Sequence, residues 1–418
     1  MELMSEKQWK RWDVVARVNA GKLTMNEAAR ICGVSVRQLR RMRGEVMDRG
    51  KEALIHGNRG RVAWNRIVEE IRGRVIELRR TKYEGFNDQH FTEKLWEEKP
   101  PVQISARTVR RILRGADIRS VRRRRARQHR KRRERRAQEG LMLLWDGSRH
   151  NWLEGRGPLL CLMGAIDDAT GKLMPGAHFV EQECAAGYLR VLYAIGSELG
   201  LPWSIYMDQH GSLKRNDDHW TLAEELEGRQ DPTQVGMALE ALEIEVIYAL
   251  SPQAKGRVER LWGTLQDRLV SELRLAGACT AEQANAVLER YRPEHNRRFA
   301  VAARETDPAW RPVRAGTDLG RICSFRYAAS VLKNNTVQLA GLVIDIPPGP
   351  RKRSYADLRV EVRQFLDGSW RVYAGEQVIA VHGPTTHGEL RTVRRNKKRS
   401  RGAPVTIPTH ATYEEASP

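Results

Sequence analysis

The 418-residue chain holds only five cysteines, and no two of them form a Cys-x-x-Cys pair. This absence argues against a zinc ribbon and against a disulfide framework. No run of about 18 apolar residues occurs, and Met1–Trp12 is charged and aromatic rather than signal-like. We therefore expect a protein of a reducing compartment, the cytoplasm, with no membrane partner. The five cysteines are Cys32, Cys161, Cys184, Cys279 and Cys323.

Signatures of several enzyme classes are missing as well. Gly164–Lys172 ends in Thr-Gly-Lys, but it lacks the glycine spacing and the following Ser or Thr of a phosphate-binding P-loop, so no use of ATP is expected. No His-Glu-x-x-His motif occurs, and no serine or tyrosine pattern indicates a covalent recombinase. His210, close to Asp208, is more simply interpreted as a polar surface residue.

Acidic residues are outnumbered by basic ones. Lys and Arg total 73 against 52 Asp and Glu, which gives a net charge of +21. A protein this basic usually faces a polyanion, because each neutralised phosphate releases condensed counterions and so favours binding. The composition therefore favours a nucleic acid as the partner, and a ribosome-associated or merely basic protein is the alternative.

Residues 1–50 are expected to be α-helical and to form a helix-turn-helix domain. Thr24 can cap a short helix, Met25–Cys32, and Ser35 can cap a helix Val36–Met47. In a helix-turn-helix the last helix enters the major groove of DNA, and a small helical bundle with a solvated basic face is the alternative. Side chains of the last helix that suit phosphates and base edges are Arg37, Gln38, Arg40 and Arg41.

Residues 62–118 repeat this pattern as a second helix-turn-helix-like domain. A helix Ile67–Lys82 precedes Asn87, which can cap the next helix, and Ser105 can cap a third, Ala106–Arg114. Two tandem domains of this kind would cover a longer DNA site than one. Candidate DNA contacts on the third helix are Arg107, Arg110 and Arg111.

Two basic segments connect these domains to each other and to the rest of the chain. His56–Arg61 is rich in Gly and Arg, so it either follows the minor groove of DNA or is an ordinary flexible linker. Residues 119–138 are dominated by Arg and Lys, and they are expected to form a basic linker that contacts phosphate, because such a block cannot pack a core. Candidate contacts in these two segments are Arg59, Arg61, Arg123 and Arg124.

The segment 139–310 alternates between strand and helix patterns. In chain order we expect three strands, a helix, a fourth strand, a helix, a fifth strand and a long helix from Gly256. This order is typical of an α/β domain in which helices pack on a mixed sheet. The expected strands are Leu141–Trp145, Leu159–Ile166, Ala177–Val180, Trp203–Met207 and Glu245–Leu250, and the earlier helices are Ala185–Leu199 and Gln234–Leu242.

The pattern changes again in residues 318–385, where short alternating segments are separated by Asn-Asn, Pro-Pro-Gly and Asp-Gly turns. We expect a small all-β barrel or sandwich there. A basic disordered tail is expected to follow over residues 386–418. The expected strands are Arg321–Tyr327, Thr336–Leu339, Leu342–Ile346, Leu358–Gln364 and Trp370–Tyr373.

Three acidic residues of the α/β segment are candidates for one site. Asp146 directly follows the apolar run Leu141–Trp145, and Asp208 follows Trp203–Met207. A carboxylate at the end of a buried strand is costly to desolvate unless a cation or hydrogen bonds compensate it. Glu259 borders the apolar stripe of the long helix, within reach of a metal held by the two aspartates. Two metal ions can clamp the attacking and leaving oxygens of a phosphoryl transfer, and turn-forming aspartates at strand ends are the alternative.

Several motifs resemble those of a known family. The segment Pro252-Gln-Ala-Lys-Gly-Arg-Val-Glu259, followed by Arg260–Gln266, resembles the final signature motif of the retroviral-integrase-like DDE transposases. Three further segments most resemble the ISNCY group of bacterial insertion-sequence transposases. They are Trp145–Ser148, Gly164–Gly171 and Glu294–Phe299. The likeness runs from the helix-turn-helix to the C-terminal barrel and so covers most of the chain.

The resemblance implies a catalytic core with a ribonuclease-H-like fold and assigns Asp146, Asp208 and Glu259 as its catalytic, metal-binding triad. It implies two Mg²⁺ or Mn²⁺ ions per active site, double-stranded DNA as partner, and a homo-oligomer, dimer or tetramer, on DNA at the nucleoid. The implied function is a DNA transposase that binds terminal inverted repeats, cleaves at the element ends and joins the 3′-hydroxyl to target DNA. A non-catalytic DNA-binding regulator and a hydrolysis-only nuclease are the alternatives. Lys255 and Arg257 are expected to touch DNA phosphates beside the triad, with a solvated helix end as the alternative.

One departure from the family concerns spacing. Glu259 lies 51 residues after Asp208 (259 − 208), a longer gap than in many relatives. The extra residues fall in the polar segment Lys214–Thr233, which we expect to be a surface insertion that leaves the sheet intact. Asp167 and Asp168 begin a good hairpin turn, and we expect them to form that turn rather than to bind metal.

Overall fold

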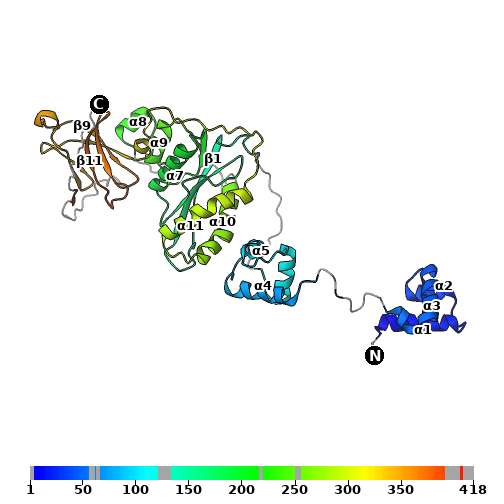
Figure 1. Ribbon diagram of the computed structural model, residues 1–418. Coiled ribbons are helices and arrows are strands. Elements are labelled where there is room, and N and C mark those ends of the chain that lie inside the picture. Colours follow the sequence, from blue (N-terminus) through cyan, green and yellow to red (C-terminus); the bar gives the residue numbers. More distant parts are fainter. Residues whose placement is uncertain are drawn as a thin grey trace. The chain divides into compact units, whose positions relative to one another are not determined.

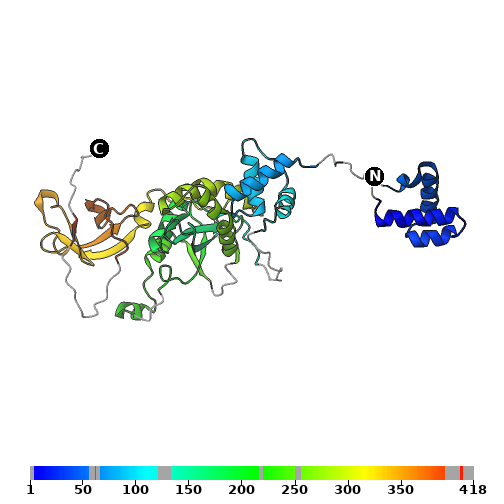
Figure 2. The ribbon, with the colours of Figure 1, turned by 90° about the horizontal axis from the view of Figure 1, so that it is seen from below.

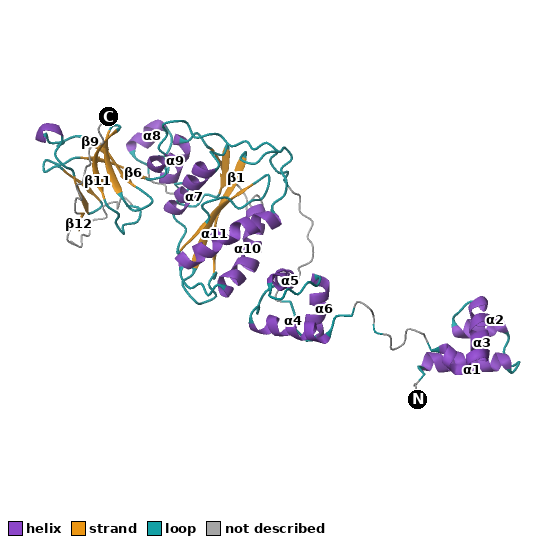
Figure 3. Cartoon of the chain, in the orientation of Figure 1, coloured by secondary structure: helices purple, strands orange, loops and turns teal. Residues whose placement is uncertain are grey.

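The computed structural model describes residues 4–55, 62, 66–120, 133–215, 220–249, 256–390 and 405–407. The chain divides into two compact units, Met1–Arg74 and Val75–Pro418, with the boundary inside the helix Glu69–Thr81. Figures 1 and 2 show the chain in two views, coloured along the sequence. The described part of the first unit is helical, whereas the second unit combines helices with strands (Figure 3). In these described ranges, no helix is long and apolar enough to span a membrane.

Three helices and one short 3-10 helix open the first unit. The predicted caps are confirmed, because the hydroxyls of Thr24 and Ser35 each accept the backbone N–H of the residue three positions on. Val15, Ala28 and Leu39, one from each helix, belong to a shared apolar core. The bounds are α1 (Glu6–Asn19), α2 (Met25–Cys32), α3 (Val36–Arg49) and η1 (Gly50–Leu54).

A second group of three helices follows along the chain, close to the predicted bounds. Arg79 is buried, and its guanidinium donates to the backbone oxygens of Tyr83 at 2.6 Å and Phe86 at 2.8 Å. A buried arginine is stable only with such partners, and these bonds hold the loop that leads to the next helix. The bounds are α4 (Glu69–Thr81), α5 (Asp88–Glu97) and α6 (Ala106–Gly115).

Five strands of the second unit form a mixed sheet in the order β3-β2-β1-β4-β5. Strand β2 pairs antiparallel with β1 and β3, whereas β4 runs parallel to β1 and β5. The mixed sheet and its helices fit the expected ribonuclease-H-like core. The pairing of β4 with β5 is intact although the predicted insertion Lys214–Thr233, with α8 (Leu222–Glu227), separates them in the chain. The strands are β1 (Met142–His150), β2 (Leu160–Asp167), β3 (His178–Val180), β4 (Ser204–Met207) and β5 (Glu245–Tyr248).

Helices cover both faces of this sheet. Trp145 of β1 belongs to a core shared with α7 and α9, whereas Leu144 belongs to a core shared with α10 and α11, which lie side by side (Figure 1). This division follows from the strand geometry, because neighbouring residues of a strand face opposite sides. The bounds are α7 (Ala185–Glu198), α9 (Gln234–Ala241), α10 (Gly256–Leu275) and α11 (Ala281–Phe299).

The last strands form two further sheets around one apolar core, in the orders β11-β10-β9-β6 and β12-β8-β7. The sequence predicted five of these strands to within a few residues. It missed β11, whose buried residues do not alternate, and the short helix α12 (Leu319–Ile322). Strand β12 (Val405–Ile407) pairs with β8 inside the segment expected to be a disordered tail. The other bounds are β6 (Phe325–Ser330), β7 (Thr336–Leu339), β8 (Leu342–Asp345), η3 (Pro350–Lys352), β9 (Arg359–Gln364), β10 (Trp370–Ala374) and β11 (Gln377–His382).

His295 of α11 is expected to make the protein less stable in acid. The ring is buried between Tyr291 and Phe299, and this burial lowers the pKa of His295 to about 4. An unfolded chain protonates the imidazole below about pH 6.5, whereas the folded chain keeps it neutral, so stability is lost as the pH falls from about 6.5 to 4. The drop in thermal midpoint between about pH 7.5 and pH 5 should be smaller for His295→Leu than for the wild type. Equal drops would contradict this assignment.

Candidate active site

Asp146 lies in β1, and Asp208 directly follows β4, the parallel neighbour of β1. The register of β1 and β4 pairs Leu144 with Tyr206, an offset of 62 residues that equals the separation of the two aspartates (208 − 146). Asp146 and Asp208 each lie two residues beyond this pair, and residues two apart face the same side of a sheet. Leu144 and Tyr206 pack on the α10 side. Asp146 is still part of β1 and contacts α10, whereas Asp208 directly follows the last residue of β4 and lies at the end of its strand.

Helix α10 holds the carboxylate of Asp146. The indole N–H of Trp262 donates to its Oδ2 at 2.9 Å. Asp146 pairs with Gly164 of β2, and a Cβ at that glycine would come within 3.4 Å of the Trp262 ring. A methyl group there would be in ordinary van der Waals contact with the indole. A hydrogen bond of this kind orients an oxygen that is to serve as a metal ligand.

A polar turn after Asp208 connects this residue to a further acid, Glu183. The backbone N–H of His210 donates to Oδ1 of Asp208 at 3.0 Å. The His210 imidazole lies 3.6 Å from Oε1 of Glu183, which also accepts the hydroxyl of Tyr188 at 2.5 Å. Burial raises the pKa of Tyr188 well above its ordinary value, and the charges of Glu183, Asp146 and Asp208 add to this effect. The phenol therefore stays protonated and donates to Glu183.

Glu259 lies in the first turn of α10, and its side chain is exposed beside the buried residues Val258 and Trp262. It thus belongs to the helix that contacts Asp146 through Trp262. Among the residues that the structure describes, no three His, Cys, Asp or Glu side chains are grouped closely enough to hold a metal ion. Carboxylate oxygens are the ligands that Mg²⁺ and Mn²⁺ prefer, so the donor types fit such ions. The two aspartates follow paired residues of neighbouring strands, but in the described residues the three acids do not form one cluster.

Sequence reasoning missed Glu183, Tyr188 and the polar contact of Trp262. Trp262 is one of the buried apolar residues of its helix, and nothing in a helical apolar stripe predicts the bond to Asp146. The available signal for Glu183 was its position shortly after the apolar strand segment Ala177–Val180, which resembles the positions of the two aspartates after their strands.

The candidate DNA contacts differ in their surroundings. Arg110 is exposed but donates to Asp88 at 3.3 Å. Arg257 donates to Asp168, so its guanidinium is engaged within the chain. The exposed candidates on α3 and α6 are Arg37, Gln38, Arg40, Arg41, Arg107, Arg110 and Arg111. The candidates Arg59, Arg61, Arg123, Arg124 and Lys255 lie outside the described residues.

A concave, basic surface lies between α1 and α3 in the first unit. This pocket has a volume of 640 Å³, and Lys7 and Arg11 of α1 line it together with Arg37, Gln38 and Arg41 of α3. Four cationic side chains and one acidic side chain, Glu45, line this hollow, and the excess of positive charge attracts phosphate groups. Three of the predicted DNA contacts thus share one surface.

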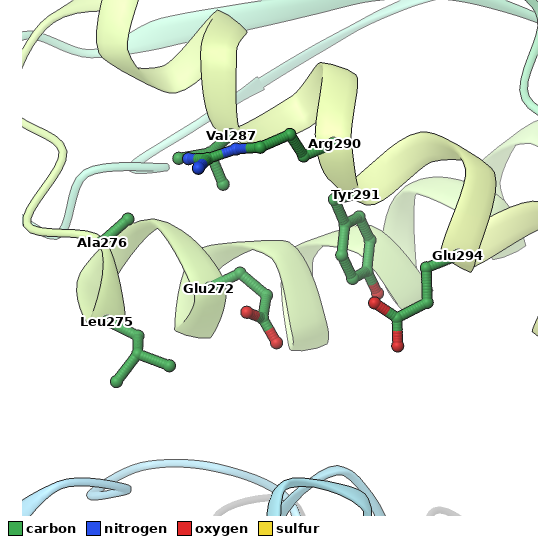
Figure 4. A pocket seen from close by; sticks show the side chains of 7 residues that line it. All are labelled: Glu272, Leu275, Ala276, Val287, Arg290, Tyr291 and Glu294. Atoms are coloured by element: carbon green, nitrogen blue, oxygen red, sulfur yellow. The ribbon is translucent and has the colours of Figure 1, made fainter. Parts of the chain in front are cut away.

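A second pocket, of 260 Å³, lies between α10 and α11 (Figure 4). Glu272 lines it from α10, and Tyr291 and Glu294 line it from α11. Glu272 is paired with His90 of α5 at 2.6 Å. Because Glu259 lies in the opposite, first turn of α10, this pocket is not part of the candidate active site.

Comparison with known proteins gives two long matches, although no profile of a known family matches the chain. Over 377 residues, the chain is 34% identical to y4bF of Sinorhizobium fredii, a protein named as a transposase, and the match covers 86% of this chain and 79% of the relative. Over 332 residues, it is 31% identical to the transposase for insertion sequence IS1202 of Streptococcus pneumoniae, and the match covers 69% of this chain and 68% of the relative.

Solved structures match at a lower level. The magnesium complex of the HTLV-2 integrase catalytic core domain has a TM-score of 0.25 and 17% identity, covering 37% of this chain and 87% of that chain. The intasome of simian T-cell lymphotropic virus with the PP2A regulatory subunit B56 gamma has a TM-score of 0.30 and 14% identity. That match covers 73% of this chain and 95% of the intasome chain.

The two bacterial relatives decide the family. Each match extends over more than two thirds of both proteins with more than 30% of residues identical. Identity at this level over such lengths reflects common descent. The chain therefore belongs to the transposase family of these two bacterial proteins, as the resemblance of its motifs predicted.

Proposed function

We propose that this transposase binds the terminal inverted repeats of its element, cleaves the DNA at the element ends and joins the freed 3′-hydroxyl to target DNA. The register of β1 and β4 supports the proposal, since it pairs Leu144 with Tyr206, two residues before Asp146 and Asp208. Helix α10, which contacts Asp146 through Trp262, bears Glu259 in its first turn. In a member of a transposase family, phosphoryl transfer on DNA is the reaction that such carboxylates serve.

Asp146, Asp208 and Glu259 would hold two Mg²⁺ or Mn²⁺ ions, which supply electrostatic stabilisation to the attacking and leaving oxygens. The chain itself orients the carboxylates. Trp262 donates to Asp146 from α10, and the backbone N–H of His210 donates to Asp208 from the turn after β4. Trp262 is buried, so Asp146 is preorganised before DNA binds, whereas His210 lies in an exposed turn.

DNA binding is assigned to the two helical groups and to the basic linker. Helices α1 to α3 would act as a helix-turn-helix, with α3 in the major groove and Gln38 near its start able to read an adenine. Helix α6 would make a second set of contacts. Two element ends must meet in one complex, so we expect a dimer or tetramer on DNA.

A joining assay tests the proposal. The full-length chain is mixed with a labelled duplex that carries the inverted repeat, a target plasmid and Mg²⁺. We expect labelled strands covalently joined to the plasmid through their 3′ ends. Cleavage without joining would indicate a hydrolytic nuclease, and binding without cleavage would indicate a regulator. Either of these results would overturn the proposal.

Trp262→Phe is expected to slow joining about tenfold, the low end of the effect of removing a partner that orients a metal ligand. Phenylalanine keeps most of the buried ring but lacks the N–H that binds Asp146. The rate at saturating DNA is the measurement. Trp203→Phe is the matched control, because it removes an indole bond of 2.8 Å to the backbone oxygen of Ala309. Equal losses in the two variants would contradict a specific role of Trp262.

A further inference from the structure

The carboxylate of Asp168 holds two arginines from distant parts of the chain. Asp168 is 0% exposed. Arg133 donates to its Oδ1 at 2.5 Å and to its Oδ2 at 3.3 Å, and Arg257 also donates to Oδ1. These two arginines lie 35 and 89 residues away along the sequence. A buried carboxylate without cations is strongly destabilising, so Asp168 requires them.

The groups around Asp168 are also linked to one another. The second guanidinium nitrogen of Arg257 donates to the backbone oxygen of Arg133. The backbone N–H of Arg136 donates to Oδ2 of Asp168 at 2.9 Å, and the Arg135 guanidinium donates to the backbone oxygen of Asp168 at 3.1 Å. The described end of the basic linker is therefore fastened to the turn after β2.

Arg257 connects this cluster to the candidate active site. It lies in the first turn of α10, two residues before Glu259, and only 19% of its side chain is exposed. At the other end of the same helix, Arg274 donates to Glu154 at 2.7 Å. One arginine–carboxylate pair thus anchors each end of α10, and the pair at the Glu259 end is the buried one.

We propose that Asp168 is a positioning residue for the transfer reaction. Through Arg257 it sets the direction of the first turn of α10 and thereby the place of Glu259, and through Arg133 it couples that turn to the basic linker. This role rests on the proposed function of Glu259. A misplacement of a catalytic group such as Glu259 by about 1 Å can cost a factor of about 100 in rate. We therefore expect loss of the cluster to slow the reaction and to leave DNA affinity unchanged.

Asp168→Asn tests this role, since the amide keeps the shape of the side chain and removes its charge. We expect the joining rate at saturating DNA to fall about tenfold or more, in the range found for groups that orient metal ligands. The Mg²⁺ concentration for half-maximal rate should rise, and the DNA affinity should not change. Arg257→Gln should reproduce all three results. Arg274→Gln, the matched control at the far end of α10, should behave as the wild type.

A wild-type rate and Mg²⁺ dependence in Asp168→Asn would overturn the positioning role. If that variant fails to fold, Arg257→Gln and Arg257→Lys decide the matter, because lysine keeps the charge but loses the two-pronged geometry. A change in DNA affinity alone in the Arg257 variants would identify a phosphate contact and refute the proposal. A wild-type protein that does not join DNA would instead refute the proposed function, so the two failures are distinguishable.

Discussion

Asp146→Asn and Asp208→Asn are each expected to abolish DNA joining while DNA binding persists. An amide keeps the size of the carboxylate but loses the charge that a divalent cation requires. A metal ion contributes several kcal/mol to the stabilisation of a phosphoryl-transfer transition state. Because about 1.4 kcal/mol is a factor of ten in rate, we expect joining to fall by about 1,000-fold or more. Time courses of joined product and separate binding isotherms measure the two properties.

Glu259→Gln is expected to have the same effect, and it is the sharper test because Glu259 is exposed and is not clustered with the aspartates. Glu181→Gln serves as the control, since it removes one negative charge from an exposed acid just after β3. Joining at the wild-type rate by an aspartate variant would refute the site. Normal joining by Glu259→Gln alone would instead point to Glu183 as the third acid, because its carboxylate lies 3.6 Å from the imidazole of His210, whose backbone N–H donates to Asp208.

Features that depend on neighbouring residues could be predicted from the sequence. The hydroxyls of the caps Thr24 and Ser105 accept the backbone N–H three residues further on. The starts of α2 and α6 could therefore be predicted from a few neighbouring residues. The five strands of the mixed sheet were all predicted because each is a short apolar run between turns. The positions of Asp146 and Asp208 on or just after neighbouring strands were predictable to the same extent, since each directly follows such a run.

Contacts between distant residues could not be predicted in this way. The turn at Asp167 and Asp168 is present, with the N–H of Gly171 donating to the backbone oxygen of Asp167 at 2.8 Å. Its sequence is that of an ordinary hairpin turn and gives no sign that the second carboxylate is buried. With 73 basic residues in the chain, nothing local selects Arg133 and Arg257 as its partners. For the same reason, Arg257 was predicted to contact DNA, whereas the structure uses its guanidinium within the chain.

Replacing Arg37, Arg40 and Arg41 together by alanine is expected to weaken binding to element-end DNA about 100-fold at about 0.15 M salt. All three side chains are exposed in the first half of α3, so their loss should not unfold the core. Each phosphate contact contributes about 0.9 to the slope of log affinity against log salt concentration. The slope should therefore fall by as much as about 3. Fluorescence anisotropy titrations at several salt concentrations measure both quantities.

Gln38→Ala should act differently, because an amide that reads a base discriminates between sequences by about 1–3 kcal/mol and neutralises no phosphate. The ratio of affinities for element-end and unrelated DNA should fall, while the salt slope stays unchanged. Arg49→Ala is the matched control, since it lies in the last turn of α3 and an inserted helix reads DNA from its N-terminal end. A wild-type salt slope in the triple variant would show that α3 is not the helix that contacts DNA. The same conclusion would follow if Arg49→Ala lowered the salt slope by a third or more of the change expected for the triple variant.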